Sequence, residues 1–335
     1  LRKCISSILK QTYRDFELIL VNDGSNDMSL DICTEFKEND NRIKIIDQIN
    51  KGSHIARKTG IENATGFFVT FVDSDDWIEP CALSKLHEIA IKYKADVVVC
   101  NSKKVFGPMF DFKLTGKRVL GRKEEYYSKK RFMSELYISF FGITNFPVSM
   151  WGKLYRRDRL REIYVDEKKR FYGEDLIFNI QVMPEMEGVV VIPDELYNYR
   201  AGGGTHKYQP LFFEELTELH KIKKRHIQKY NLGEVFEYYL IIELINTYKA
   251  FIVMELVAGK LKKEELIKRL DCTLKNEEII NAINHPKISR YRDQDFINAI
   301  KGHNVQELIR TAKKGILKKK AKRFFIGVLT KMANF

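Results

Sequence analysis

Short apolar segments alternate with amphipathic segments through the first third of the chain. The apolar segments, which are rich in Val, Ile and Phe, cover residues 16–21, 43–47, 67–72 and 96–100. Between them, apolar residues recur at helical spacing in segments 28–39, 53–64 and 80–93. This alternation is typical of βαβ units, in which helices cover both faces of a mainly parallel sheet. The predicted fold class is therefore α/β.

The pattern becomes less regular in the middle of the chain and wholly helical after it. The middle part contains a predicted helix at 129–141 and the apolar segment 171–183. Later apolar positions recur only at helical spacing, most clearly at 211–222, 235–256 and 305–309. The three parts predicted from these changes are residues 1–108, 109–205 and 206–335.

Composition narrows the class of protein. The 335 residues are enough for two domains or for one domain with an appendage, and the apolar content of 44% is ample for a core. The five cysteines are scattered, odd in number and without metal-ligand spacing, which predicts a reducing compartment and no disulfide framework. No apolar run approaches the ~20 residues that span a bilayer. We therefore expect a cytoplasmic protein.

The positive charge is concentrated at the C-terminal end. The formal net charge is +13, yet residues 301–335 carry ten Lys or Arg against the single acid Glu307. Within segment 313–323, seven of eleven residues are basic. On a helix, one face would collect the apolar residues Leu317, Ala321, Phe324, Phe325, Val328 and Met332. We expect an amphipathic helix on an anionic membrane surface; a solvated charge run and nucleic-acid binding are the alternatives. No nucleic-acid-binding module accompanies the charge, so nucleic acid is not expected as a partner.

Acidic residues gather where one apolar segment stops, in the sequence Phe-Val-Asp-Ser-Asp-Asp-Trp at 71–77. Ligands of open α/β sheets bind at the carboxyl ends of the strands. Asp73 and Asp75 are two residues apart, so in an extended chain their side chains point the same way. Paired carboxylate oxygens suit Mg²⁺ or Mn²⁺. The alternative is an acidic turn that caps the helix beginning near Pro80.

Three further segments carry candidate chemistry. Asp23 follows another apolar segment, where it could cap the next helix or accept hydrogen bonds from a nucleobase or ribose. Arg57 lies within a predicted helix, where it could meet a base or diphosphate or simply be solvated. Glu174 and Asp175 lie at the start of a predicted helix, where negative side chains are stabilised by the helix dipole. Alternatively, one of the two could act as a base for a sugar hydroxyl.

Taken together, these segments resemble the family 2 glycosyltransferases. The similarity rests on four motifs in this order: Val-Asn-Asp-Gly-Ser at 21–25, Ala-Arg-Lys-Thr-Gly at 56–60, the acidic segment at 71–77, and Gly-Glu-Asp-Leu-Ile-Phe at 173–178. It covers roughly residues 1–205 and implies the GT-A fold. Residues 1–108 would then form the nucleotide-sugar-binding half and residues 109–205 the acceptor-binding and catalytic half.

The resemblance also implies how a donor would be bound. Asp23 would contact the base of a nucleoside diphosphate, and Arg57 would lie beside that base or the ribose. Asp73 would hold the ribose or the metal, and Asp75 would bind the Mg²⁺ or Mn²⁺ that bridges the diphosphate. His206 follows a glycine loop at a place where some relatives supply a third metal ligand, although a loop histidine can equally be solvated.

For the transfer step, the resemblance makes Asp175 the catalytic base, with Glu174 beside it. Trp151 belongs to a stretch similar to the family's acceptor site, and Trp77 is a second candidate for acceptor contact. A single base, with no second carboxylate placed as a nucleophile, implies inversion at the anomeric carbon. The expected reaction is metal-dependent and moves a sugar from a nucleoside-diphosphate-sugar, such as a UDP-sugar, to a glycan or lipid-linked saccharide acceptor. Cell-surface polysaccharide synthesis on the inner membrane face is the expected setting.

One departure from the family concerns the start of the chain. The family's first strand, which ends in a nucleotide contact, has no counterpart before Leu1. The sequence instead opens within an amphipathic segment whose Ile5, Ile8 and Leu9 share one face. We therefore expect that the natural N-terminus is missing.

Two rival functions stay open at this point. A nucleotidyltransferase acting on sugar phosphates uses a similar sheet and metal. It is expected to carry a glycine-rich loop near its first strand, a region that the sequence does not show. A non-catalytic sugar- or nucleotide-binding relative would need neither Asp75 nor Asp175, so the presence of both argues against it. Release of a nucleoside diphosphate from a UDP-sugar separates the transferase from both.

Overall fold

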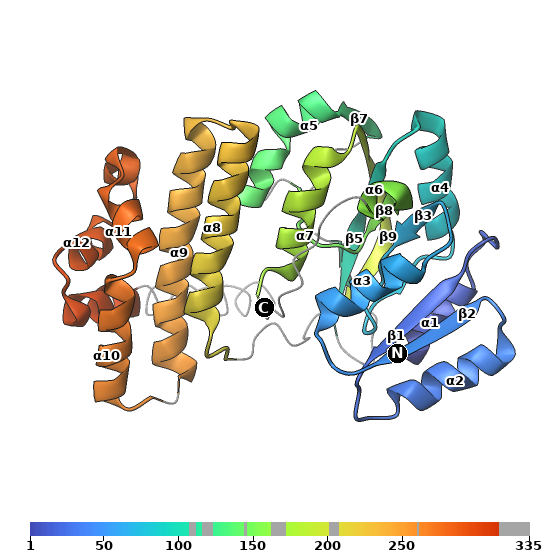
Figure 1. The fold of residues 1–335 in the computed structure, drawn as a ribbon, viewed down its shortest axis with the longest axis horizontal. Helices are drawn as coiled ribbons and strands as arrows, with labels where there is room; N and C mark the ends of the chain where they lie inside the picture. Colours follow the sequence, from blue (N-terminus) through green and yellow to red (C-terminus); the bar gives the residue numbers. More distant parts are fainter. Residues whose placement is uncertain are drawn as a thin grey trace, which may run out of the picture. The chain divides into compact units, whose positions relative to one another are not determined.

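The chain forms two compact units, Leu1–Lys207 and Tyr208–Phe335 (Figure 1). The computed structural model describes residues 1–106, 112–115, 123–143, 146–161, 172–200, 208–259 and 261–314. Each unit has its own hydrophobic core, and each is described by itself below.

The first unit alternates strands and helices through its first hundred residues. Its early elements are α1 (Arg2–Leu9), β1 (Leu18–Asp23), α2 (Ser29–Asn39), β2 (Ile43–Gln48), α3 (Ser53–Asn63), β3 (Phe68–Thr70), β4 (Trp77–Ile78), α4 (Ala82–Tyr93) and β5 (Val97–Phe106). Its later elements are β6 (Phe112–Thr115), β7 (Glu125–Ser128), α5 (Lys129–Glu135), η1 (Tyr137–Phe141), β8 (Lys153–Arg156), α6 (Arg157–Arg161), α7 (Glu174–Val182), η2 (Met183–Glu185) and β9 (Gly188–Arg200).

The strands form two sheets. β1 and β2 pair in parallel, with Leu18 opposite Ile43. The larger sheet has the order β3-β8-β5-β9-β4, with β6 on β5 and β7 on β9. β5 and β9 are parallel, whereas β8 is antiparallel to both β3 and β5. The predicted α/β class is confirmed, and the larger sheet is mixed because later strands return antiparallel to those of the βαβ region.

One core joins the two sheets. It contains Ile5 of α1, Ile43 of β2, Ile89 of α4 and Val98 of β5, all of which are 1% exposed or less. Helix α4 faces this core because its apolar residues recur every three or four positions. Because the core connects β1 and β2 to the larger sheet, loops at the ends of β1 and β3 belong to one packed body.

The predicted helix at 129–141 is divided into α5 and η1 at Leu136. Ser128 caps α5 by accepting a hydrogen bond from the Arg131 amide. The 3-10 segment that follows is almost entirely buried and ends at Gly142, whose φ of 97° is favourable for glycine. Tertiary packing of its aromatic rings, such as Phe140 on Phe146, outweighs the continuous helical pattern.

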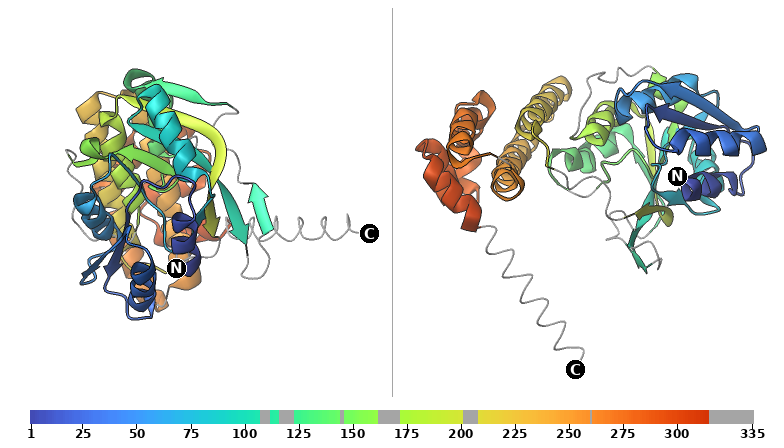
Figure 2. Two further views of the ribbon diagram at one scale, coloured as in Figure 1. Left: turned by 90° about the vertical axis from the view of Figure 1, so that its right-hand side faces the viewer. Right: turned by 90° about the horizontal axis from the view of Figure 1, so that it is seen from below.

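The second unit is helical throughout its described part. Its elements are α8 (Phe212–Tyr230), α9 (Glu234–Ala258), α10 (Lys263–Leu274), α11 (Glu277–Asn284), η4 (Pro286–Arg290) and α12 (Gln294–Lys301), followed by helical residues 305–314. Helices α8 and α9 lie side by side in both views (Figures 1 and 2). None of the helices in the described ranges is long and apolar enough to cross a membrane.

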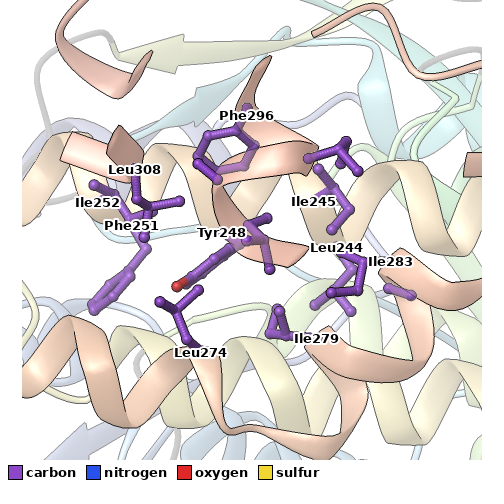
Figure 3. Packing of buried hydrophobic residues seen from close by; sticks show 14 of the residues in the cluster. Leu244, Ile245, Tyr248, Phe251, Ile252, Leu274, Ile279, Ile283, Phe296 and Leu308 are labelled. Carbon is purple, nitrogen blue, oxygen red and sulfur yellow. The ribbon is translucent and has the colours of Figure 1, made fainter. Parts of the chain in front are cut away.

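Helix α9 supplies the centre of the second core (Figure 3). Its Leu244, Tyr248 and Phe251 are at most 1% exposed, and the helices after it pack around them. The Tyr248 hydroxyl is 2.7 Å from the Thr273 hydroxyl, so the buried phenol keeps a polar partner. Ala312 is also fully buried in this core, which therefore extends almost to Lys314.

Candidate active site

The loop that follows β3 is anchored by its last acidic residue, Asp76. This side chain is 1% exposed and accepts hydrogen bonds from the Tyr197 hydroxyl (2.8 Å) and the Arg200 amide (2.7 Å). The Tyr197 hydroxyl in turn accepts one from the Asp73 amide at 3.1 Å. Strand β9 therefore holds the loop through Asp76. The other two acids, Asp73 and Asp75, are left for other contacts. Asp73 is half-buried and Asp75 is exposed.

The Asp76 carboxyl should give the protein a measurable pH dependence. Burial raises its pKa from 3.8 to about 6, so over this range the folded protein holds a proton that the unfolded chain has lost. The group's contribution to stability is therefore present below the lower value and is lost as the pH rises towards about 6. Relative to Asp76→Asn, the wild-type free energy of unfolding is expected to fall by up to about 3 kcal/mol over this range.

Urea unfolding of both proteins in EDTA, at several pH values across this range, measures the difference in the free energy of unfolding. The chelator keeps divalent cations away from the neighbouring carboxylates. A difference that stays constant with pH would show that the Asp76 carboxyl titrates normally.

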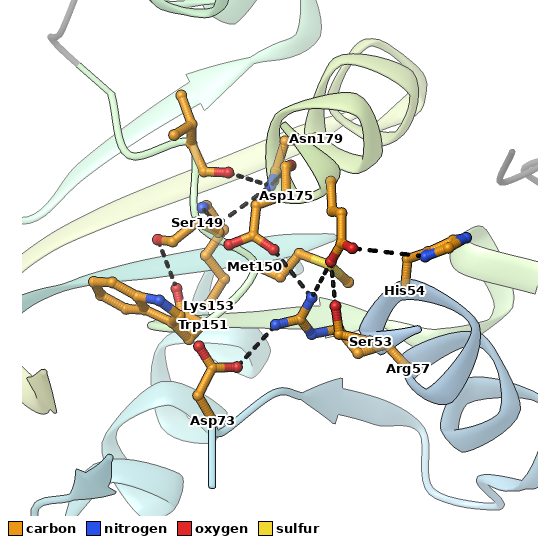
Figure 4. Close-up of polar contacts among 12 residues, drawn as sticks. Ser53, His54, Arg57, Asp73, Ser149, Met150, Trp151, Lys153, Asp175 and Asn179 are labelled. Atoms are coloured by element: carbon orange, nitrogen blue, oxygen red, sulfur yellow. Dashed lines mark hydrogen bonds and ion pairs between the residues drawn. The ribbon is translucent and has the colours of Figure 1, made fainter. Parts of the chain in front are cut away.

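Arg57 connects the end of β3 to the start of α7 (Figure 4). Its guanidinium lies 2.9 Å from Asp73 Oδ1, 3.2 Å from Asp175 Oδ1 and 3.6 Å from Glu174 Oε2. Burial disfavours the charge on Arg57, but the three carboxylates outweigh it and raise the pKa of the guanidinium. One cation thus gathers three of the predicted site residues, which come from segments about a hundred residues apart.

The start of α7 presents Glu174 and Asp175 to α3. Gly173 precedes them with a φ of 77°, a backbone conformation that side chains disfavour. Glu174 accepts a hydrogen bond from the Ser53 hydroxyl, and its other oxygen lies 3.8 Å from His54 Nδ1. Burial raises the pKa of the Asp175 carboxyl above its usual value, and Arg57 opposes this shift. A carboxylate with a raised pKa suits general-base chemistry near neutral pH.

Asp23 acts at the entry to α3. Its carboxylate accepts hydrogen bonds from Gln48 Nε2 (2.7 Å) and from the amides of Lys51 (2.9 Å) and Gly52 (2.8 Å). These bonds fix the loop that leads into the helix of Arg57. Asp23 is therefore linked to the cluster through α3, whereas Arg57 makes the direct contact with Asp73.

The two tryptophans differ in exposure. Trp151 is partly exposed and stacks on Tyr197 at 4.4 Å between ring centroids. Trp77 is 8% exposed, with Lys3 Nζ 3.4 Å from its ring centroid and Arg200 on the ring as well. These contacts cover Trp77, so Trp151 is the better placed of the two to meet an acceptor. His206 lies outside the described residues.

Several residues around this cluster were not singled out from the sequence. They are Ser53, His54, Asp76, Lys153 and Asn179. Asn179 carried a usable signal, because a residue four positions after Asp175 lies on the same face of a helix. His54 carried none: it is 9% exposed, and within the described part of the chain neither ring nitrogen has a hydrogen-bond partner.

The carboxylates at the end of β3 fit a divalent cation that a substrate helps to bind. Within the described ranges, no group of three or more His, Cys, Asp or Glu side chains is arranged to hold a metal. Mg²⁺ is, however, usually bound by one or two carboxylates together with substrate phosphates and water. Asp73 and Asp75 provide two such carboxylates, and only one oxygen of Asp73 is occupied by Arg57.

Comparison with known proteins gives a family and a fold. The model of "Glycosyl transferase family 2" matches residues 1–163. Glycosyltransferase GlyA of Streptococcus pneumoniae is 39% identical over 61% of this chain, but the match spans only 29% of GlyA. Glycosyltransferase GlyG of the same species is 31% identical, over 61% of this chain and 67% of GlyG. The uncharacterized glycosyltransferase EpsJ of Bacillus subtilis is 29% identical over 85% of this chain and 82% of EpsJ.

Among solved structures, residues 1–349 of TarS from S. aureus share the fold. Their complex with UDP has a TM-score of 0.66 at 19% identity, covering 94% of this chain and 87% of that one. The complex with UDP-GlcNAc covers the same shares at a TM-score of 0.61. At this identity the likeness concerns the fold, and the predicted GT-A class is confirmed.

Proposed function

Because the chain belongs to glycosyl transferase family 2, we propose that it transfers a sugar from a UDP-sugar to a hydroxyl group of a glycan or lipid-linked saccharide. The proposal is carried by one observation. The Arg57 guanidinium holds Asp73, from the carboxyl end of a strand, beside Asp175, from the start of a helix. A donor diphosphate and an acceptor hydroxyl need these two kinds of group within reach of each other.

In this proposal Asp175 is the general base. It takes the proton of the acceptor hydroxyl while that oxygen attacks the anomeric carbon and the nucleoside diphosphate leaves. Arg57 keeps the carboxylate charged, because its guanidinium is 3.2 Å away. Glu174 is tied to Ser53 and positions the helix start beside Arg57. A single displacement by one base inverts the configuration of the transferred sugar.

Asp73 and Asp75 would hold Mg²⁺ or Mn²⁺ at the end of β3, with His206 as a further candidate. The cation would neutralise negative charge on the leaving diphosphate. Asp23 would fix the loop into α3 and face the nucleobase side, and Trp151 would offer a ring to the acceptor sugar. UDP is the proposed nucleotide, and the UDP and UDP-GlcNAc complexes of TarS, which shares the fold, support this choice.

A panel of UDP-sugars tests the proposal. The protein is incubated with each donor, Mg²⁺ or Mn²⁺ and candidate saccharide acceptors, and UDP release and product configuration are measured. Release of UDP with an inverted glycoside supports the transferase. Formation of a nucleotide-sugar from a sugar phosphate, with pyrophosphate, would identify a nucleotidyltransferase. Binding of UDP without turnover of any donor would identify a non-catalytic relative.

The basic C-terminal segment supports a location at the inner face of the membrane, next to a lipid-linked acceptor for cell-surface polysaccharide. The predicted amphipathic helix at 313–333 lies outside the described residues from residue 315 onward. A basic residue near an anionic surface contributes about 1 kcal/mol. Ala312 is buried in the second core, so a truncation that tests the segment has to leave residues up to Lys314 in place.

The chain truncated after Lys314 is expected to lose binding to vesicles that contain an anionic lipid, whereas the full chain binds at low salt. Replacing the five basic residues between 318 and 323 with glutamine is the matched control for charge, and should weaken binding to a similar extent. Binding of the full chain should also fall with salt, since the Debye length shrinks to about 3 Å at 1 M. Equal co-sedimentation of all three proteins would make the segment a solvated charge run.

A further inference from the structure

Lys153 is a fully buried lysine beside the candidate base. Its side chain is 0% exposed, and Nζ donates hydrogen bonds to the carbonyl oxygens of Pro147 (2.9 Å) and Ser149. No carboxylate of the described residues lies within ion-pair distance of Nζ. Burial lowers the pKa of Lys153 to about 7. A buried ammonium without a carboxylate partner is costly, so its position calls for a reason other than stability.

Two other buried side chains form hydrogen bonds with main-chain carbonyl groups of the same segment, residues 147–150. Asn179 Nδ2 donates to the carbonyls of Val148 (2.9 Å) and Ser149 (3.2 Å) and lies 2.8 Å from the Asp175 carbonyl. The Tyr155 hydroxyl lies 3.1 Å from Asn179 Oδ1 and 3.4 Å from the Met150 carbonyl. We call Lys153, Tyr155 and Asn179 the carbonyl clamp. The clamp donates to the carbonyl oxygens of Pro147, Val148 and Ser149, and the Tyr155 hydroxyl shares its single proton between Asn179 Oδ1 and the Met150 carbonyl.

The segment held by the clamp touches both sides of the site. The Met150 amide lowers the pKa of the Asp175 carboxyl and so favours its ionised form. Asn179 joins the segment to the same residue, because its Nδ2 lies within hydrogen-bond distance of the carbonyls of Ser149 and Asp175. The next residue, Trp151, stacks on Tyr197 with an interplanar angle of 11°. Lys153, Met150, Trp151 and Asp175 are seen together in Figure 4. The carbonyls of the segment thus face the buried clamp, while the Met150 amide favours the charged form of the Asp175 carboxylate.

We propose that Lys153 is a positioning residue for transfer: through the carbonyl clamp it holds segment 147–150 so that the Met150 amide meets Asp175 and Trp151 keeps its stacked place. This inference rests on the proposed function, in which Asp175 is the base. Methionine at position 153 would fill a similar volume but donate no hydrogen bond, so the segment would be free to shift. A displacement of about 1 Å at a reacting group can cost about 10²-fold in rate.

The first test is a double-mutant cycle on the full chain. Lys153→Met is expected to lower kcat for UDP release by about 10- to 10²-fold, with the KM for the UDP-sugar unchanged. In an Asp175→Asn background the same replacement should have little further effect, because the group it positions is gone. An equal loss of rate in both backgrounds would overturn the proposal. Near-normal turnover of Asp175→Asn alone would instead refute the base assignment, and with it the proposed mechanism.

The second readout needs no turnover, because the chain has only two tryptophans. In a Trp77→Phe background, Trp151 is the sole tryptophan, and its acrylamide quenching reports whether it stays stacked. Lys153→Met should raise quenching, and Tyr155→Phe, a milder change that keeps the ring, should raise it less. Lys223→Met, a buried lysine in the second unit, is the control for loss of a buried charge and should leave quenching unchanged. Unchanged quenching in both Lys153→Met and Tyr155→Phe would refute the clamp.

Discussion

Replacing Asp175 with asparagine is expected to lower kcat for glycosyl transfer by a factor of about 10² to 10⁴, the usual contribution of a positioned base. Asparagine has nearly the same shape but cannot accept the acceptor's proton. Affinity for UDP, measured by calorimetry, should change little, because Arg57 keeps its ion pair with Asp73 at 2.9 Å. Asp158→Asn is the matched control, since Asp158 is a largely exposed carboxylate of the same unit paired with Arg156.

The pH profile of the wild-type enzyme gives the same test a second form. The base must be ionised to work, so the rate should fall as the pH drops through the pKa of Asp175, which burial raises above the ordinary value. That acid limb should be absent from the residual rate of Asp175→Asn. Turnover close to wild-type in this variant would remove Asp175 from the mechanism.

Removing the Asp75 carboxylate is expected to lower the transfer rate about as much as Asp175→Asn does, but through loss of a bound cation. A cation on the diphosphate contributes several kcal/mol of charge stabilisation, and about 1.4 kcal/mol corresponds to tenfold in rate. Asp75→Ala should therefore lose at least about 10²-fold in transfer rate, and EDTA should reduce the wild-type rate to a similar level. Asp75 is exposed, so the replacement should leave the fold intact.

Two measurements separate a metal role from a general effect of charge. The residual activity of Asp75→Ala should not respond to EDTA, and Mn²⁺ titrated in the presence of UDP should bind the wild-type but not the variant. Asp31→Ala, which removes an exposed carboxylate from α2, should behave as wild-type in both. EDTA-resistant transfer by the wild-type would contradict the metal assignment outright.

The sequence was most informative where local pattern and tertiary structure agree. Helix α3 begins at Ser53, as predicted, and the strand predicted at 43–47 is β2, one residue longer. The local pattern did not predict the structure where contacts with residues distant in the sequence determine it. β4 is only Trp77–Ile78, a strand because it pairs with β9. The break at Leu136 likewise reflects packing of aromatic rings that no local period reveals.

In the candidate site, too, some residues were predicted from the sequence and others depend on tertiary contacts. The resemblance to the family singled out Arg57, Asp73, Glu174 and Asp175, and the structure brings these four into contact. It gave Asp76 no role, because the burial of this carboxyl against β9 depends on tertiary structure that the motif does not reveal. Lys153 was also passed over, since a lysine in a short motif looks the same whether its ammonium is solvated or, as here, buried against carbonyls.

The carbonyl clamp holds its segment by main-chain atoms only, and this has a consequence for how acceptor preference could change during evolution. The peptide carbonyl is common to every amino acid, so the identity of most side chains in 147–150 is not what the clamp recognises. Val148 illustrates the freedom: its carbonyl is bonded to Asn179, yet the residue is 41% exposed. Libraries randomised at Val148 should therefore yield folded enzymes in which Asp175 is still positioned as the base. Their acceptor selectivity can then change while the transfer step stays the same.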